Sequence, residues 1–186
     1  MALTEEELIL LFKRKDPDAF KVLYNQYASR MMAVCVRYMG DPDDARDVLQ
    51  DGFIKVLKYI GNFRSEGSLE GWIRRIIVNT ALLALRKNKL RYAESTDETF
   101  ELHTNFDEAI DRISMKELLQ MISSLPTGYR TVFNLNVMEG HSHKEIAEEL
   151  GITESTSRSQ LTKARSLLQE MIVRQRQPAS RTLPII

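Results

Sequence analysis

The residues from Ser155 to Gln169 carry side chains suited to contact with nucleic acid. With 100° per residue, a helix over this stretch gathers one polar face: Ser155, Arg158, Ser159, Thr162 and Ser166. Its flanks add Gln160, Lys163 and Arg165, and no acidic residue lies within the stretch. Hydroxyl and guanidinium groups bond phosphate oxygens and base edges in a major groove, where a carboxylate would be repelled. The alternative is an ordinary solvated face, but such a face usually mixes both charge signs, so the pattern favours DNA binding.

A short helix and a tight turn are expected to hold this polar face. Ile146, Ala147 and Leu150 form one apolar edge ahead of Gly151, and glycine allows the tight turn that follows. The side of the second helix opposite its polar face is more apolar: Ser157, Leu161, Ala164 and Leu168. Residues 142–171 therefore predict a DNA-binding helix-turn-helix.

A second polar and basic group lies near the middle of the chain. Arg75, Asn79 and Arg86 share one side of a predicted helix, and a loop over residues 64–70 leads into it at Trp72. Cations track the phosphates of a nucleic-acid strand, while small polar groups and aromatics hold exposed bases. A tryptophan alone more often belongs to the core, where it would support the loop.

An acidic stripe lies on another predicted helix, at Asp44, Asp47 and Asp51. Acids near a helix N-terminus complement the helix dipole, which accounts for Asp43 and Asp44. Asp51 lies beyond the first turn and could instead pair with Lys55. From the residues alone, a structural role and a partner-binding role both stay open.

Signs of catalytic or metal chemistry are missing from the sequence. His141 and His143 have no recognisable third metal ligand. Cys35 is the only cysteine and falls among apolar residues, so we expect it in the core. No phosphate-binding P-loop and no nucleophile elbow is present. We expect no enzyme activity, no metal and no cofactor.

Helices are expected to position these groups, because 8 glycines and 5 prolines in 186 residues provide few turns. Thr4 with Glu7 forms a capping box that should start a helix at about Glu5. Asp16-Pro17 and Asp41-Pro42 should each open a helix, and Gly40 should end the first of these. The second should run to Gly61 with these apolar positions inward: Ala45, Val48, Leu49, Phe53, Val56, Leu57 and Ile60.

Further helices are expected in the remainder of the chain. Ser68 should cap a helix that extends to about Arg91, helical spacing resumes at Ile110, and Pro126 should begin a helix that carries Leu135. No strand pattern is seen. The sequence predicts an all-α protein.

Charge is segregated along the chain although 26 basic and 26 acidic residues cancel. Acidic residues concentrate between two mildly basic blocks, and periodicity fails after Tyr92. We therefore expect a helical domain over residues 1–92, a flexible acidic linker over 93–106, a second domain over 107–175 and a tail over 176–186. The linker acids could cover the basic DNA-binding surfaces.

Apolar runs are too short to cross a membrane, because none exceeds five residues and a spanning helix needs about 20. The acidic start lacks the basic region of a secretion signal. We expect a soluble, cytoplasmic protein without membrane insertion.

Three stretches in the same order resemble bacterial RNA polymerase sigma factors of the small two-domain extracytoplasmic-function (ECF) group. They are GDPDDARDVLQDGFIKVLKYIGNF, EGSLEGWIRRIIVNTALLALRK and LPTGYRTVFNLNVMEGHSHKEIAEELGITESTSRSQLTKAR. The resemblance implies a region 2-like helical bundle that binds core RNA polymerase and the minus-10 promoter element. It implies a region 4-like helix-turn-helix that reads the minus-35 element, with the linker in place of a third domain. An anti-sigma protein is a further implied partner.

The resemblance also implies roles for individual residues. Three match the segment that docks on the polymerase clamp: Asp47, Gln50 and Asp51. Residues of the loop and the helix after it match the element that captures an unstacked promoter base: Arg64, Ser65, Glu66, Gly67, Ser68, Trp72, Arg75, Asn79 and Arg86. Two residues depart from the family pattern. Leu83 stands where many members have an acid, and Ser157 stands where many have an apolar residue that packs beneath the recognition helix.

Other classes of protein explain the sequence less well. A dimeric helix-turn-helix regulator could carry the same C-terminal motif. A response regulator would need a receiver domain of alternating strands and helices, which residues 1–92 do not suggest. A structural helical adaptor would not explain the acid-free helix face. The expected function is promoter-specific transcription initiation with RNA polymerase.

Overall fold

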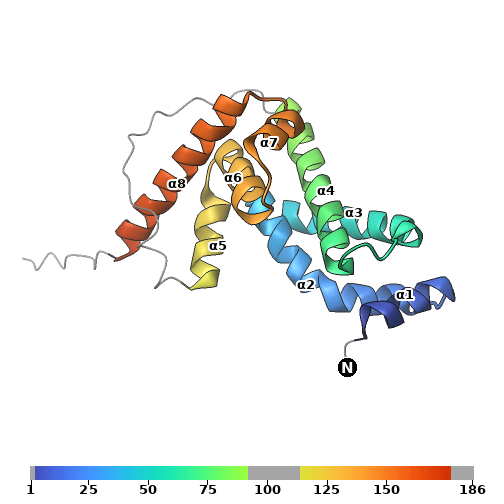
Figure 1. The fold of residues 1–186 in the computed structure, drawn as a ribbon. Helices are drawn as coiled ribbons and strands as arrows, with labels where there is room; N and C mark the ends of the chain where they lie inside the picture. Colours follow the sequence, from blue (N-terminus) through green and yellow to red (C-terminus); the bar gives the residue numbers. More distant parts are fainter. Residues whose placement is uncertain (1–2, 92–113, 177–186) are drawn as a thin grey trace, which may run out of the picture. The chain divides into compact units, whose positions relative to one another are not determined.

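The computed structural model describes residues 3–91 and 114–176, and within these ranges every regular element is helical (Figure 1). The all-α prediction is confirmed. The chain divides into two compact units, residues 1–96 and 97–186. The expected linker over 93–106, Ile110 and most of the expected tail fall outside the described residues, so the domain limits stay predictions.

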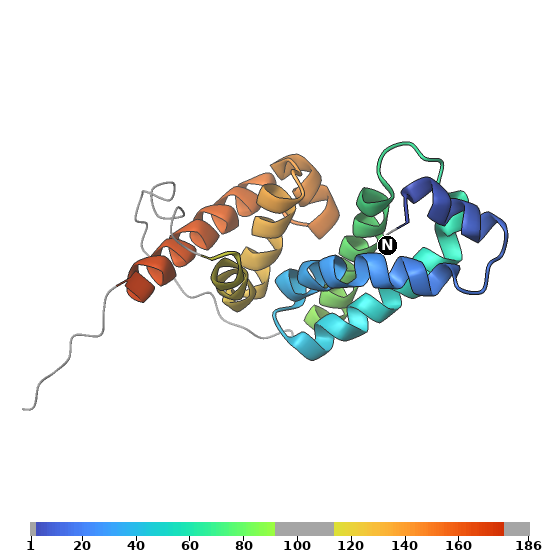
Figure 2. The same ribbon diagram turned by 90° about the horizontal axis from the view of Figure 1, so that it is seen from below.

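The first unit contains four α-helices and a short 3-10 turn. They are α1 (Glu5–Lys13), α2 (Ala19–Met39), α3 (Pro42–Tyr59), η1 (Ile60–Asn62) and α4 (Leu69–Arg91). The helices α2, α3 and α4 pack against one another, and α1 packs on α2 (Figures 1 and 2). Large side chains fill the space between them: Tyr27, Met31, Phe53, Ile73 and Ile77.

Capping residues set several of the helix ends in this unit. The Thr4 hydroxyl accepts a hydrogen bond from the Glu7 amide at 3.2 Å, and the Glu7 carboxylate accepts one from the Thr4 amide at 2.8 Å. Asp41 accepts from the amides of Asp43 and Asp44 with Pro42 next to it, as predicted. Gly40 ends α2 with φ of 77°, in the region that favours glycine.

Two predicted boundaries in this unit were wrong. The helix α2 begins at Ala19 and not at Asp16-Pro17, because the Asp16 carboxylate accepts from the Asp18 amide at 2.8 Å and closes a turn ahead of the helix. The helix α3 ends at Tyr59, two residues before the predicted end at Gly61, because the chain tightens into the 3-10 turn η1 over Ile60–Asn62.

A close approach of two helices explains the glycine within α3. A Cβ atom added at Gly52 would lie 2.3 Å from Cδ1 of Ile77 on α4. Any larger side chain at this position would overpack the interface between α3 and α4. Elsewhere in this core, Cys35 is fully buried as predicted, and burial raises the pKa of its thiol to about 12, so the thiol stays protonated.

The second unit comprises α5 (Met115–Ser124), α6 (Thr127–Phe133), η3 (Asn134–Met138), α7 (His143–Leu150) and α8 (Glu154–Arg176). Pro126 precedes α6 as predicted, but Leu135 lies in η3, a π-helical turn that continues from α6. The buried guanidinium of Arg130 donates to the carbonyls of Ser123 and Leu125 at 2.8 and 2.9 Å. Arg130 therefore joins the end of α5 to α6.

Candidate nucleic-acid interface

The helices α7 and α8 form the predicted helix-turn-helix. Ser142 and Glu145 make a capping box at the start of α7, and Gly151 ends the helix in the left-handed conformation with φ of 67°. The Thr153 hydroxyl then accepts from the Thr156 amide at 3.0 Å and caps α8. Ile146 and Leu161 are buried where the two helices meet.

A hydrogen bond between α7 and α8 explains how a polar residue, Ser157, fits at a buried position. This serine is 0% exposed, and its Oγ lies 2.9 Å from Nδ1 of His143 on α7. A buried hydroxyl without a partner would destabilise the fold. The hydrogen bond with His143 therefore allows a serine at position 157, where many family members have an apolar residue. The sequence did not reveal this pair, because the two residues lie on different helices.

His141, which lies between η3 and α7, also has a neighbour within the fold. Nδ1 of His141 lies 3.5 Å from a carboxylate oxygen of Glu149. Among residues 3–91 and 114–176, no three histidine, cysteine or acidic side chains gather where they could hold a metal ion.

The outer face of α8 is placed much as expected near its N-terminus. Five residues are exposed there: Ser155, Arg158, Ser159, Thr162 and Arg165. Gln160 and Lys163 are half-buried beside α6, where the Lys163 ammonium lies 5.7 Å from the centre of the Tyr129 ring.

Internal contacts hold several of these groups in defined orientations. The Arg158 guanidinium donates to Glu154, one turn earlier, at 2.8 Å. The hydroxyls of Ser159 and Thr162 donate to the carbonyls of Thr156 and Arg158, each at 3.0 Å. These two oxygens therefore face outward as acceptors, which suit amino groups on base edges better than phosphates.

The polar face is shorter than the sequence indicated, because Ser166 is only 6% exposed. The two residues after it, Leu167 and Leu168, are buried as well. Three consecutive buried residues require cover on more than one side of the helix. The prediction for Ser166 was therefore wrong, and the outward face ends near Arg165.

In the first unit, a projecting loop joins η1 to α4. Phe63 at its start is half-buried, and the five residues that follow are all exposed: Arg64, Ser65, Glu66, Gly67 and Ser68. Ser65 and Gly67 adopt φ of 58° and 98°, and a left-handed non-glycine residue such as Ser65 costs about 1–2 kcal/mol. At the base of the loop the rings of Phe63 and Trp72 lie 5.6 Å apart, so the half-buried Trp72 packs against the first residue of the loop.

The helix after this loop exposes the predicted residues on one side. Arg75, Asn79 and Arg86 are all exposed, at the spacing that places them along one face of α4. Leu83 lies on the edge of this face and is 47% exposed. An apolar side chain therefore lies among groups suited to a nucleic-acid strand.

On α3, the predicted docking residues Asp47, Gln50 and Asp51 are all exposed. Lys55 donates to the Thr80 hydroxyl at 3.0 Å and forms no ion pair with Asp51, the partner that the sequence suggested. Within the described parts of the chain, neither Asp47 nor Asp51 forms an ion pair. Their charges remain available to a partner.

Two apolar residues beside this acidic stripe are exposed as well. Ile54 is 56% exposed and Leu57 is 48% exposed. The assignment of Leu57 to the core was wrong, because Leu57 lies just outside the arc of α3 that faces α2 and α4. Ile54 lies between Gln50 and Asp51 around the helix, a position that the helical spacing of the sequence already indicates.

Comparison with known proteins gives a consistent result over both units. Residues 23–91 match the family described as Sigma-70 region 2, and residues 115–168 match Sigma-70, region 4. The RNA polymerase sigma-H factor of Pseudomonas aeruginosa is 29% identical over 180 residues, which cover 90% of this chain and 93% of the relative. The ECF RNA polymerase sigma-E factor of Haemophilus influenzae is 28% identical over 183 residues, which cover 91% and 96%.

A solved structure has the same fold. The sigma factor RpoE of Bartonella quintana, in complex with the anti-sigma factor NepR, aligns with a TM-score of 0.50 and 20% identity. The alignment covers 86% of this chain and 99% of that one.

The two matched regions define a sigma factor of the sigma-70 family, a transcription initiation factor that acts with RNA polymerase at specific promoters. Within this family the chain belongs to the ECF group. The predicted function is confirmed, and the dimeric regulator is not favoured, because the region 2 match accounts for the first unit. In the part of the chain that the structure describes, no helix combines the length and apolar character of a membrane span.

Proposed function

We propose that the two units divide the promoter between them. The unit built from α1 to α4 binds core RNA polymerase through Asp47, Gln50 and Asp51 and opens the minus-10 element with the loop over residues 64–68. The unit built from α5 to α8 reads the minus-35 element. The observation that carries this assignment is the outer face of α8, whose exposed groups from Ser155 to Arg165 are hydroxyls and guanidinium groups.

The protein acts by differential binding and has no catalytic activity of its own. Its contacts with an unstacked strand exist only after the duplex opens, so they favour the open state over the closed one. RNA synthesis remains the work of the polymerase. The site of action is the cytoplasm, where a bacterium keeps its chromosome and its polymerase.

An anti-sigma protein is the further proposed partner. The structural neighbour from Bartonella quintana is a sigma factor in complex with an anti-sigma factor. For this chain, the exposed Asp47, Asp51 and Ile54 offer a mixed acidic and apolar surface that such an inhibitor could cover in competition with polymerase.

Reconstituted transcription tests the proposed function. Core polymerase is incubated with the purified full chain and genomic DNA from the source bacterium, and the transcript starts are sequenced. We expect discrete starts that share a two-part upstream motif and are missing with core enzyme alone. A folded protein that adds no new start would contradict the proposal.

Contacts of Arg158 and Lys163 with the minus-35 element are tested by alanine substitution. Losing one good base contact costs about 1–3 kcal/mol, whereas losing a phosphate contact weakens binding to all sequences alike. We expect Arg158→Ala to lower the affinity of holoenzyme for its promoter more than for a scrambled minus-35 duplex. Because Lys163 is held against Tyr129, we expect Lys163→Ala to weaken both duplexes equally.

A matched control comes from the same helix. Arg174 pairs with Glu170 in the same one-turn geometry as Arg158 with Glu154, but it lies near the C-terminal end of α8. Arg174→Ala should leave binding unchanged in a fluorescence anisotropy titration at fixed salt. If Arg158→Ala and Lys163→Ala both bind like the control, the assigned minus-35 face is wrong.

A further inference from the structure

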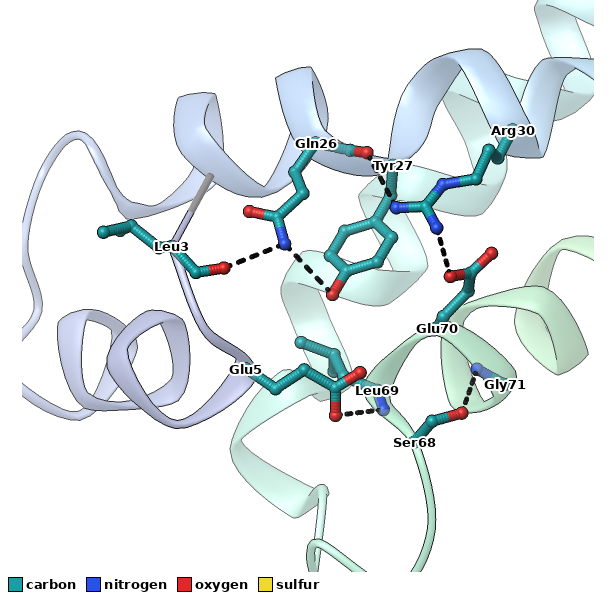
Figure 3. A network of polar contacts seen from close by, with 9 residues as sticks. All are labelled: Leu3, Glu5, Gln26, Tyr27, Arg30, Ser68, Leu69, Glu70 and Gly71. Carbon is teal, nitrogen blue, oxygen red and sulfur yellow. Dashed lines mark hydrogen bonds and ion pairs between the residues drawn. The ribbon is translucent and has the colours of Figure 1, made fainter. Parts of the chain in front are cut away.

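The first helix is joined to the start of α4 by a side chain that lies 64 residues earlier in the sequence. An oxygen of the Glu5 carboxylate accepts a hydrogen bond from the backbone amide of Leu69 at 2.9 Å (Figure 3). Leu69 is the first residue of α4 and is fully buried. The contact therefore fixes the backbone at the point where the projecting loop ends.

Two further contacts hold this junction on α2. The Gln26 amide donates to the carbonyl of Leu3 at 3.1 Å, which ties the segment before α1 to α2. Arg30 pairs with Glu70 in the first turn of α4 at 2.5 Å. In Figure 3, Glu5 and Arg30 thus meet the first turn of α4 from two different helices.

The N-terminus of α4 requires such acceptors, because the first four amides of a helix have no partner within the helix. Ser68 provides one from its own chain segment, since its hydroxyl accepts from the Gly71 amide at 3.1 Å. Glu5 provides another, and its negative charge also complements the helix dipole. One of the two caps therefore belongs to α1, outside residues 23–91 that match region 2.

The geometry of the loop makes this cap relevant to function. Its first end is held by the contact between Phe63 and Trp72 and its second end by Ser68 and Glu5, while the residues between them are exposed. Ser65 keeps an unfavourable φ of 58° in this arrangement. A loop with a strained residue relaxes when an anchor is lost, and the conformation that fits an unstacked base then becomes rarer.

We propose that Glu5 is a positioning residue for promoter opening, and that α1 sets the position of the loop over residues 64–68 through the Glu5–Leu69 hydrogen bond. The inference rests on the proposed role of this loop. It assigns to α1 a function in opening the minus-10 element, in addition to its packing on α2.

Three full-length variants assembled with core polymerase test this role. Glu5→Ala removes the acceptor, and we expect open-complex yield on a fully paired promoter to fall about fivefold, the size typical of losing a helix cap. Glu5→Gln keeps an amide oxygen that can accept from Leu69, and it should restore most of the yield. Glu6→Ala removes the neighbouring exposed acid and should behave like the unchanged protein.

Separate measurements distinguish positioning from a general loss of structure. Competition for core polymerase should be the same for all three variants, and the melting temperature of Glu5→Ala should fall by no more than the few degrees expected for one lost cap. The loss of open-complex yield in Glu5→Ala should shrink on a promoter mismatched at minus-10. A full yield from Glu5→Ala on paired DNA would overturn the inference, as would an equal loss in Glu6→Ala. Alanines at residues 65–68, assayed in parallel, report whether the loop itself opens DNA, so failure of the proposed function is recognised separately.

Discussion

Reversal of both Asp47 and Asp51 to lysine is expected to weaken binding to core RNA polymerase about 100-fold or more, because close charge pairs at an interface couple by about 1.5–7 kcal/mol. Both side chains are exposed on α3, and neither forms an ion pair within the described residues. Exposed charges usually contribute little to stability, so the helical content should stay nearly the same. The expected loss is therefore one of partner binding and not of folding.

Competition for a limited amount of core enzyme measures this effect directly. A labelled unchanged protein is displaced by increasing amounts of the double variant, and circular dichroism records its fold. Glu6→Lys with Asp18→Lys is the matched control, since it reverses two exposed acids of the same unit by the same total charge. A folded double variant that competes as well as the control would refute the assignment of this stripe to the polymerase.

Local sequence signals predicted many helix ends correctly. Thr4 with Glu7, Asp41 with Pro42, and Gly40 act through backbone groups no more than four residues away, so each can be recognised without knowledge of the fold. Asp16 misled the prediction for the same reason. An aspartate ahead of a proline can cap a helix or close a turn, and here its carboxylate bonds the Asp18 amide.

Periodicity predicted which face of a helix is covered, but not how far the cover extends. Leu57 lies just outside the packed arc of α3 and is exposed, whereas Ser166 lies on the polar face of α8 and is buried. Both errors arise because an amphipathic pattern assumes one covered face of constant width along the helix. The width depends on the neighbouring elements, which a single helical stretch does not reveal.

The contacts that orient the candidate sites join residues far apart in the sequence. His143 bonds Ser157, Lys163 lies over Tyr129, and Glu5 caps α4 at Leu69. No short motif encodes these pairs, because each depends on how two helices pack. The sequence therefore indicated the residue types at the candidate sites, while the structure was needed to show what holds them.

Replacement of residues 65–68 by alanine is expected to spare closed-complex formation and to reduce promoter opening. Extraction of a base from the duplex costs a few kcal/mol, and contacts made only with the unstacked strand must offset this cost. Losing one good contact with a base costs about 1–3 kcal/mol, so the loss of the loop's polar contacts should lower the open-complex yield roughly 10- to 100-fold. The loop meets the geometric requirement, because its five exposed residues lie directly before the face of α4 that carries Arg75 and Asn79.

The same substitution also removes the Ser68 cap of α4, and Ser68→Ala alone measures that part of the effect. We expect the open-complex yield of Ser68→Ala to fall about fivefold, as for the loss of other helix caps. The yield of the four-residue variant should fall clearly further. Permanganate reactivity of promoter thymines reports opening on a fully paired template and on one mismatched at minus-10. The four-residue variant should recover most of its signal on the mismatched template, because no base pair has to be broken there. A full signal from this variant on paired DNA would contradict a role of the loop in melting, and an equal loss on both templates would place its contribution after strand separation.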